Sequence, residues 1–395
     1  MKWLFVILIV IYSTTGLTRP QYANRSGSVS CDSCHLNPAG GGIRTIIGKA
    51  YGSHGLGFGT YSANQHFQGD MRTIALFPTA NSFKSNNTGL GLMNAILSAS
   101  APITNSNQAA EMRAVVAYDA APFFSGIQEA YLRYQTVAKD GKWLPRYITW
   151  GRFAIPFGLL TEEHRTYTKL QSRTDMRTFE MGVMLSSSPS HKIHYDLALV
   201  NGQGTGGDTG LSGGTTDFSW AIVPNLRLKP FEFPLTIGIS GNFLHLDSSK
   251  SPYSVVLYSV ASISEQLDWS FELVRSRYLN DENRNSNMTN FINSTKTAAL
   301  YQAIRKSTSL GLYSLLNYKV GPKTDLVYKL EALTLDENYL SDAYLRHGVG
   351  IKRWINSNLN LIIRYEHAMI NRAGIKESGV YAGRDFLMLI LHAWL

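Results

Sequence analysis

The stretch LDWSFELVR, residues 267–275, alternates apolar and polar side chains. Its odd-numbered residues from Leu267 to Leu273 are apolar, and its even-numbered residues from Asp268 to Glu272 are polar. Because successive side chains of an extended chain point to opposite faces, this pattern predicts a β-strand with one apolar and one charged face.

The same alternation recurs from about residue 67 to the end of the chain, in segments of about ten residues. DLVYKLEAL (325–333) and NLNLIIRYEH (358–367) each place their charged side chains on one face, and the last ten residues, FLMLILHAWL, form a strand with two mainly apolar faces. AALYQAIRK (298–306) fits either an extra strand or a helix in a loop. Turn residues between the segments predict an all-β fold of about 16 antiparallel strands, give or take about two, starting near 67, 90, 109, 127, 146, 179, 192, 217, 234, 253, 267, 308, 325, 343, 358 and 384.

A soluble β-sandwich shows the same alternation, so the choice of fold depends on other features. Aromatic residues gather near strand ends, and the chain ends inside a strand, as in the C-terminal assembly signal of outer-membrane proteins, although with Leu395 in place of Phe or Trp. Short turns such as 264–266, 320–324 and 355–358 alternate with long segments at 157–178, 201–216, 280–307 and 371–383. Transmembrane barrels pair short periplasmic turns with long outer loops. We therefore expect an outer-membrane β-barrel with both ends on the periplasmic side.

Composition and the N-terminus agree with export. The chain has 34 Gly, 21 Tyr, 17 Phe and only 16% charged residues. Its first residues, MKWLFVILIVIYSTTG, have one lysine, a short apolar run and small residues, which is typical of a secretory signal. No basic run accompanies the net charge of +9, so we expect no nucleic-acid partner. The predicted organisation is a signal peptide (1–18), a short N-terminal segment (19–66) and a barrel (67–395).

The stretch SCDSCHLNPAGGG, residues 30–42, holds the only two cysteines, with a histidine directly after the second. Cys31, Cys34 and His35 form C-x-x-C-H, the attachment motif of c-type haem. The two thiols add to the haem vinyl groups, and the histidine coordinates the iron. A disulfide or a redox C-x-x-C does not require the histidine, and a structural zinc site would need further ligands. We expect one haem c.

The second axial ligand of the haem iron stays open. His54, in GSHGLGFG, is the first candidate as a distal metal ligand because its flanking glycines let the backbone approach a ring. His66 and Met71 are the alternatives, and each also fits an ordinary residue at the start of a strand. The segment 19–66 is too small to bury a haem alone. We therefore expect it to plug or cap the barrel.

A signal peptide, one C-x-x-C-H motif and a barrel of about 16 strands together resemble the fused outer-membrane monohaem cytochrome c-porins of iron-oxidising bacteria. The segment YANRSGSVSCDSCHLNPAGGGIRTIIGKAYG (22–52) is similar to their haem segment, and WGRFAIPFGLL (150–160) resembles a strand-to-loop segment of porins. The resemblance implies haem thioethers at Cys31 and Cys34 and proximal ligation by His35. The glycine-rich NPAGGG departs from the pattern of that group, which leaves the substrate open.

The leading functional hypothesis is electron transfer across the outer membrane, between an external partner such as Fe(II) and a periplasmic cytochrome or other carrier. Acidic triplets at 281–283 and 336–338 fit either cation attraction or ordinary solvated loop charge. The alternative is an outer-membrane transport porin with a periplasmic haem appendage. A barrel enzyme or adhesin with a disulfide is a third class. Whether the protein is an enzyme, for example an iron oxidase, stays open. Outer-membrane lipid is an expected partner in each case.

Overall fold

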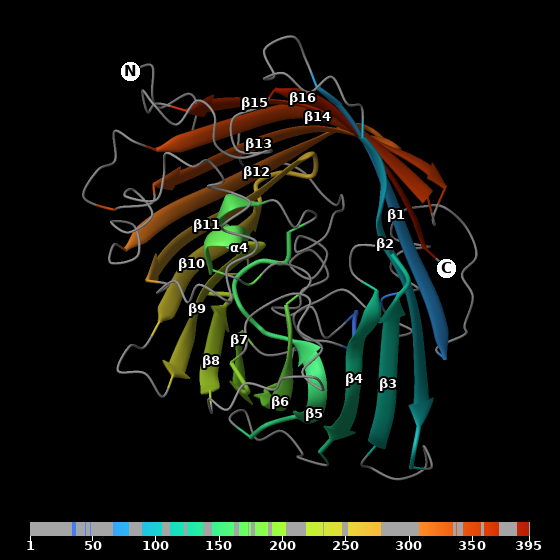
Figure 1. Ribbon diagram of the computed structural model, residues 1–395, viewed down its shortest axis with the longest axis vertical. Helices are drawn as coiled ribbons and strands as arrows, with labels where there is room; N and C mark the ends of the chain where they lie inside the picture. Colours follow the sequence, from blue (N-terminus) through green and yellow to red (C-terminus); the bar gives the residue numbers. More distant parts are fainter. Residues whose placement is uncertain are drawn as a thin grey trace, which may run out of the picture.

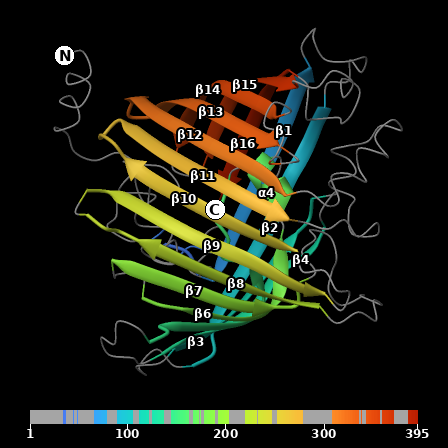
Figure 2. The same ribbon diagram turned by 90° about the vertical axis from the view of Figure 1, so that its left-hand side faces the viewer.

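The computed structural model is a closed barrel of 16 antiparallel strands, each hydrogen-bonded to its neighbours in chain order. Figure 1 looks into the barrel, and Figure 2 shows the tilt of its strands from the side. The structure describes residues 34–36, 44, 48, 66–78, 89–104, 111–121, 125–136, 144–161, 166–172, 174, 178–188, 192–202, 219–231, 233–246, 252–277, 308–334, 337, 343–356, 359–370 and 385–394.

The strand positions follow the alternating segments of the sequence. The first eight strands are β1 (Phe67–Pro78), β2 (Gly89–Pro102), β3 (Glu111–Asp119), β4 (Gly126–Gln135), β5 (Tyr147–Ala154), β6 (Phe179–Ser186), β7 (Ile193–Val200) and β8 (Ser219–Leu228). The last eight are β9 (Leu235–Leu246), β10 (Tyr253–Ser262), β11 (Leu267–Arg277), β12 (Ser309–Gly321), β13 (Thr324–Thr334), β14 (Tyr344–Asn356), β15 (Leu359–Ile370) and β16 (Phe386–Trp394). The predicted starts near 109 and 384 lie two residues before the observed starts of β3 and β16. The segment 298–306 lies outside the described residues.

Closure of the sheet decides between sandwich and barrel. The first and last strands pair antiparallel, with Ile74 opposite Ile390 at the middle of the ladder. A closed sheet leaves no strand edge, so every strand has a hydrogen-bonding neighbour on both sides. This is the requirement for a sheet that crosses a membrane, and it confirms the predicted barrel.

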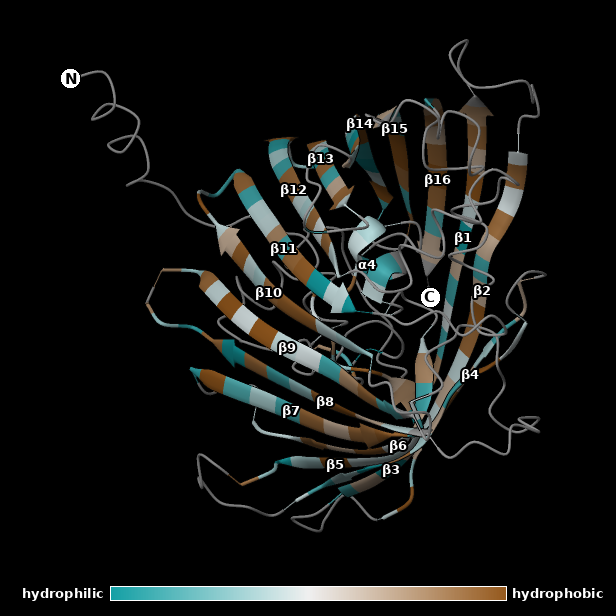
Figure 3. Cartoon of the chain, turned by 60° about the vertical axis from the view of Figure 1, so that its left-hand side comes forward, coloured by the Kyte–Doolittle hydropathy of each residue, from teal (hydrophilic) through white to brown (hydrophobic). Residues whose placement is uncertain are grey.

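Hydrophilic and hydrophobic residues alternate along many of the strands (Figure 3), and the burial of their side chains shows that the two faces of the sheet differ in polarity. On β11, β13 and β15 the acidic residues point inward and are buried, whereas Leu326, Tyr328 and Ile363 point outward and are exposed. Large exposed apolar residues also mark the outward faces of many other strands, including Leu97, Val116, Trp150, Leu199, Ile239, Leu257 and Val349. An apolar exterior around a polar interior is the arrangement that a lipid bilayer requires.

Connections differ between the two ends of the barrel. Strands β12 and β13, and strands β14 and β15, are joined through residues 322–323 and 357–358. The long connections 155–178, 201–218, 278–308 and 371–385 all follow odd-numbered strands, so the strand ends that they join are at the opposite end of the barrel. β1 begins and β16 ends at the short-turn end, which confirms the predicted parity. The element named α4 (Tyr167–Ser172) lies within a long connection. In the part of the chain that the structure describes, no helix is long and apolar enough to cross a membrane.

Candidate functional site in the barrel lumen

The connection between β5 and β6 folds into the barrel instead of projecting from it. Figure 1 shows α4, which belongs to this connection, inside the ring of strands. It packs against β11, β12 and β13. Ahead of the helix, Ile155, Phe157 and Leu159 are buried among inward-facing apolar residues, which we call the apolar lumen cluster. Its wall members are Val115, Tyr131, Phe153, Met184, Ala198, Val200, Ala221, Val223, Leu244, Val256, Tyr258, Val260 and Val274.

Gly158 gives this connection its sharp bend. Its φ is +61°, in the left-handed region that favours glycine. Its N–H donates a hydrogen bond of 2.8 Å to the Ser240 hydroxyl, and a Cβ at this position would lie 2.5 Å from Oε2 of Glu272. Both the backbone angle and the lack of space require a glycine here.

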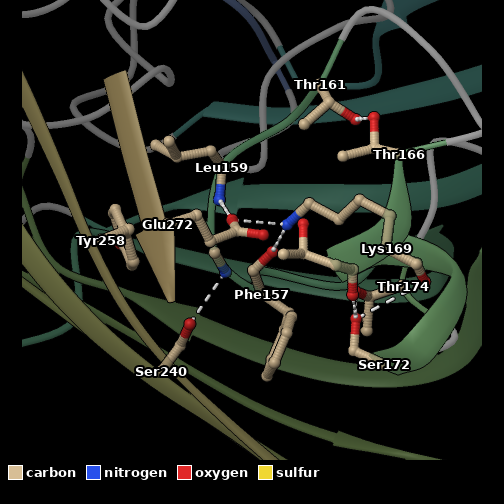
Figure 4. A network of polar contacts seen from close by, with 12 residues as sticks. Phe157, Leu159, Thr161, Thr166, Lys169, Ser172, Thr174, Ser240, Tyr258 and Glu272 are labelled. Atoms are coloured by element: carbon tan, nitrogen blue, oxygen red, sulfur yellow. Dashed lines mark hydrogen bonds and ion pairs between the residues drawn. The ribbon is translucent and has the colours of Figure 1, made fainter. Parts of the chain in front are cut away.

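A buried ion pair holds the connection against the barrel wall (Figure 4). Lys169 Nζ lies 2.7 Å from Glu272 Oε2, and the Leu159 N–H donates to the same oxygen at 2.7 Å. The exposed fractions of the Lys169 and Glu272 side chains are 1% and 0%. Because both charges have left water, their mutual contact offsets part of the desolvation cost of each.

A second set of charged side chains, on β13 and β14, contacts the start of α4. The Tyr167 N–H donates to Glu331 Oε1 at 3.0 Å, and the Arg346 guanidinium carbon lies 4.3 Å from the centroid of the Tyr167 ring. Arg346 Nε donates to Glu331 Oε2 at 2.7 Å. Burial raises the pKa of the Tyr167 phenol above its ordinary value, so this ring stays neutral.

The ionic contacts continue along the wall. Lys329 Nζ lies 3.0 Å from Glu331 and 2.5 Å from Glu366, and Arg364 Nε lies 2.8 Å from Glu366. All four side chains are at most 3% exposed. Although these groups face the lumen, they are covered, so this part of the wall does not line an open water channel.

The described half of the C-x-x-C-H motif, Cys34 and His35, also lies near the lumen wall. Cys34 is buried, and His35 forms an isolated antiparallel bridge with Arg44. Gly48 lies directly against the Cys34 backbone, where a Cβ would be 2.1 Å from the Cys34 carbonyl oxygen. The motif is therefore packed closely against its own downstream segment.

Two barrel residues hold this segment. Arg133 Nη1 on β4 donates to the Leu36 carbonyl and lies 3.5 Å from the His35 carbonyl oxygen. The Leu36 side chain packs against the apolar lumen cluster. On another part of the barrel wall, Gln68 Oε1 on β1 accepts a hydrogen bond of 2.8 Å from the Arg44 N–H. Gln68 lies near the start of β1 and Arg133 near the end of β4, so the motif lies toward the short-turn end of the barrel.

The remaining predicted site residues are distributed differently. Cys31 and His54 lie outside the described residues. His66 is exposed just before β1, and its Nδ1 lies 3.0 Å from the Ser100 carbonyl oxygen. Met71 is 44% exposed and lies on the outward face of β1. Of the three distal-ligand candidates, Met71 therefore points away from the lumen that contains His35.

The described residues around the motif fit a c-type haem. Such a haem needs thiols, a histidine and an apolar surface for its ring. Cys34 and His35 supply a thiol and an imidazole, and the apolar lumen cluster adjoins Leu36. Arg133 is a buried cation beside the motif, and among the described residues its Nε donates no hydrogen bond. Also within the described residues, no group of three or more His, Cys, Asp or Glu is arranged to hold a metal ion.

Sequence reasoning missed the residues that receive the motif. Strand alternation in GIQEAYLRYQ (126–135) places Arg133 on the same face as Tyr131, but no local pattern predicts that this face contacts residues 35 and 36. The apolar lumen cluster was also missed, because we expected the interior face of the barrel to be polar. Of the acidic triplets, only Glu337 is described, and its carboxylate bonds Arg275 at 2.7 and 2.8 Å. The other five residues of the triplets lie outside the described residues.

Comparison with solved structures identifies the fold. The anion-selective porin from Comamonas acidovorans has a TM-score of 0.56 and 9% identity, covering 83% of this chain and 98% of the porin. OmpF of Salmonella typhi, in complex with daunomycin, has a TM-score of 0.57 and 9% identity over 83% of this chain and 97% of that one. The outer-membrane channel DcaP of Acinetobacter baumannii has a TM-score of 0.53 and 10% identity, with 83% and 96% covered. No family model and no curated protein matches the chain.

The class of protein follows from these findings. A closed 16-strand antiparallel barrel with an apolar exterior and a charged interior has the fold of bacterial outer-membrane porins. Within this barrel, an inserted connection and the C-x-x-C-H segment both contact the lumen wall.

Proposed function

We propose that this protein transfers electrons across the bacterial outer membrane through one c-type haem carried at the periplasmic end of a porin-like barrel. The observation that carries the proposal is the contact of Leu36 and His35 with Arg133 and the apolar lumen cluster. A haem attached next to these residues would lie against the barrel wall and not in a separate domain.

The chain's own residues have defined parts in this proposal. Cys31 and Cys34 would attach the haem, and His35 would hold its iron on the proximal side. The bound haem would supply one-electron redox chemistry. The apolar lumen cluster would shield one side of the site from water, and Arg133 and Gln68 would hold the segment in place.

The proposed route of electrons depends on which end of the barrel faces the periplasm. If the short turns face the periplasm, as in bacterial barrels, the haem segment lies where a periplasmic cytochrome or other carrier could dock. The long connections then face outward, where an external partner such as Fe(II) would approach. The inserted connection 155–174 lies between these two sides. Its buried contacts with Glu272 and Glu331 would limit the free passage of solutes.

A second candidate is a transport porin in which the haem segment is an appendage. The likeness to porins, one of them described as anion-selective, favours this function. The two candidates differ in the state of the lumen, because a transport porin needs a continuous water path. The buried ion pairs of β11, β13, β14 and β15 support a filled interior along the part of the barrel wall that these strands form.

Two measurements on the full-length protein in outer-membrane fractions separate the candidates. A reduced-minus-oxidised absorption spectrum with a c-type haem signal, together with reduction of that haem by Fe(II) in intact cells, is the result expected for electron transfer. Single-channel conductance, measured with and without residues 17–66, tests transport. A large conductance in the complete protein, with a haem that external donors fail to reduce, would favour the transport porin. Absence of any haem adduct would refute the electron-transfer proposal.

A further inference from the structure

Two histidines lie side by side on the outward face of the barrel, near the end that carries the long connections. His347 on β14 and His367 on β15 are partners in the strand register. The centroids of their rings are 5.3 Å apart, and the ring planes meet at 77°. His347 is the fourth residue of β14 and His367 the fourth from the end of β15. At about 3.4 Å per residue, both lie about 10 Å from the ends of their strands.

The outward surface around the pair is apolar. Val349 follows His347 on the outward face of β14, and Tyr365 and Met369 flank His367 on the outward face of β15; all three are exposed. The His367 side chain is itself 36% exposed, so its ring can be reached from outside the barrel. Ionisable side chains are costly on a surface that faces lipid, so their presence there indicates a function.

A carboxylate holds one of the two rings in place. Asp385 lies one residue before β16, and its Oδ1 is 2.7 Å from His367 Nδ1. The same oxygen accepts the Ala368 N–H at 3.1 Å, and Oδ2 accepts the Tyr365 hydroxyl at 3.1 Å. Because an ionised carboxylate can only accept, His367 Nδ1 carries a proton in this contact. A neutral His367 ring therefore presents an unprotonated Nε2.

This arrangement is the one found around histidines that bind metal ions. A ligating imidazole commonly donates its second ring N–H to a carboxylate, which fixes the tautomer and the orientation of the ring. Two imidazoles that bind one ion at about 2.0–2.1 Å and at a tetrahedral angle have ring centroids roughly 5 Å apart. The observed separation of 5.3 Å agrees with this geometry. Within the described part of the chain, the His347 ring contacts the His367 ring and forms no hydrogen bond.

We propose that His347 and His367 together bind one divalent transition-metal ion of the class that prefers imidazole ligands, such as Zn²⁺. The two rings supply the protein ligands, Asp385 positions the His367 ring, and water completes the coordination of the ion. The ion joins β14 to β15 beside the long connection 371–385 and stabilises this end of the barrel. The site lies outside the lumen and is independent of the proposed haem.

The test uses the full-length protein in detergent, freed of loosely bound metal with a chelator, and four variants. His347→Gln and His367→Gln each remove one ligand, and Asp385→Asn keeps a hydrogen-bond acceptor but removes its charge. His245→Gln is the matched control, because His245 is an exposed histidine of β9 whose register partner on β8 is Trp220. Heat-dependent gel mobility verifies that each barrel folds, and isothermal titration calorimetry with Zn²⁺ measures binding.

The parent should bind one more Zn²⁺ per chain than His347→Gln or His367→Gln. Asp385→Asn should keep this site but weaken its affinity for Zn²⁺ about tenfold to a hundredfold, the usual cost of losing such a carboxylate. His245→Gln should bind as the parent does. Because an ion that binds the folded state stabilises it, Zn²⁺ should also raise the temperature of the gel-mobility transition in the parent and in His245→Gln. It should not raise this temperature in the two variants that lack a ligand.

Each other result has a distinct meaning. Equal Zn²⁺ stoichiometry and affinity in the parent and in a folded His347→Gln or His367→Gln protein overturns the metal site. An equal loss in His245→Gln also overturns it, since binding would then come from surface histidines in general. Parental affinity in Asp385→Asn overturns the positioning role of the carboxylate. Failure to bind Zn²⁺ leaves the electron-transfer proposal intact, and a protein without haem leaves the metal site intact.

Discussion

Replacing Lys169 by methionine tests the physical basis of the inserted connection. The Lys169→Met side chain keeps a similar length but removes the charge that faces Glu272. In the structure the Glu272 carboxylate is fully buried, and its Oε2 receives Lys169 Nζ and the Leu159 N–H, each at 2.7 Å. Its Oε1 has no hydrogen-bond partner among the described residues. The substitution therefore leaves a buried carboxylate with one neutral donor.

The expected cost follows from this geometry. Removing one partner of a buried ion pair costs about 3–5 kcal/mol, because the remaining charge is left without compensation. This destabilisation should appear as local opening of the connection 155–174, because the barrel strands do not depend on the connection for their ladder hydrogen bonds. At about 1.4 kcal/mol for each factor of ten, the population of the open state rises about a hundredfold to a few thousandfold.

Hydrogen exchange at the Leu159 amide measures this opening, because the amide is bonded to Glu272 itself. Its exchange rate in folded, detergent-solubilised Lys169→Met protein should rise by that factor, while amides in β13 keep their protection. The double variant Lys169→Met with Glu272→Gln is the matched control and should recover much of the protection, because the carboxamide oxygen can still accept from the Leu159 N–H and no unpaired charge remains. An increase below about threefold in Lys169→Met would show that the ion pair does not hold the connection, and the reasoning would be refuted.

Three further predictions concern other parts of the chain. Gly158→Ala should lower the free energy of local opening of the same connection by about 1–2 kcal/mol from backbone strain alone. Faster proteolysis of the folded protein between β5 and β6 would show this opening, and unchanged cleavage would contradict the need for glycine. The hydrogen bonds from Arg275 hold the pKa of Glu337 below its ordinary value. The stability that this ion pair contributes to the folded protein is therefore complete above the unfolded glutamate pKa of about 4.3, and it is lost as the pH falls through the lower pKa of the folded state. Because the pair is partly exposed, Glu337→Gln should reduce thermal stability at neutral pH by at most about 1 kcal/mol, and the difference from the parent should disappear in acid. Replacing both Cys31 and Cys34 by serine should abolish the haem spectrum yet leave heat-modifiable gel mobility, whereas a retained c-type signal would contradict attachment at these thiols.

The barrel was predictable because its signal is periodic and repeated. In LDWSFELVR the alternation alone assigned Glu272 to the interior and Phe271 to the exterior, and the structure confirms both faces. The parity of short and long connections was equally visible, since it depends on the lengths of segments between strands. The strand number and most boundaries followed from the same two features.

The contents of the lumen were not predictable in this way. No local pattern relates Lys169 to Glu272 or Leu36 to Arg133, since these pairs are 103 and 97 residues apart in the chain. Apolar inward residues such as Val256 and Phe153 also conflict with the expectation of a polar interior, and they become reasonable only once a folded-in connection covers them.

The sequence by itself therefore determined the strands of the barrel and the two faces of its sheet, because each depends on neighbouring residues or a short repeat. The assignment of the C-x-x-C-H motif to haem stays a prediction. Only the tertiary structure decided that the connection 155–174 enters the barrel and that residues 34–36 lie against β4 near its short-turn end. Those positions depend on burying specific charges and apolar groups against distant strands. The free energy of such contacts is set by which groups meet after the barrel has closed.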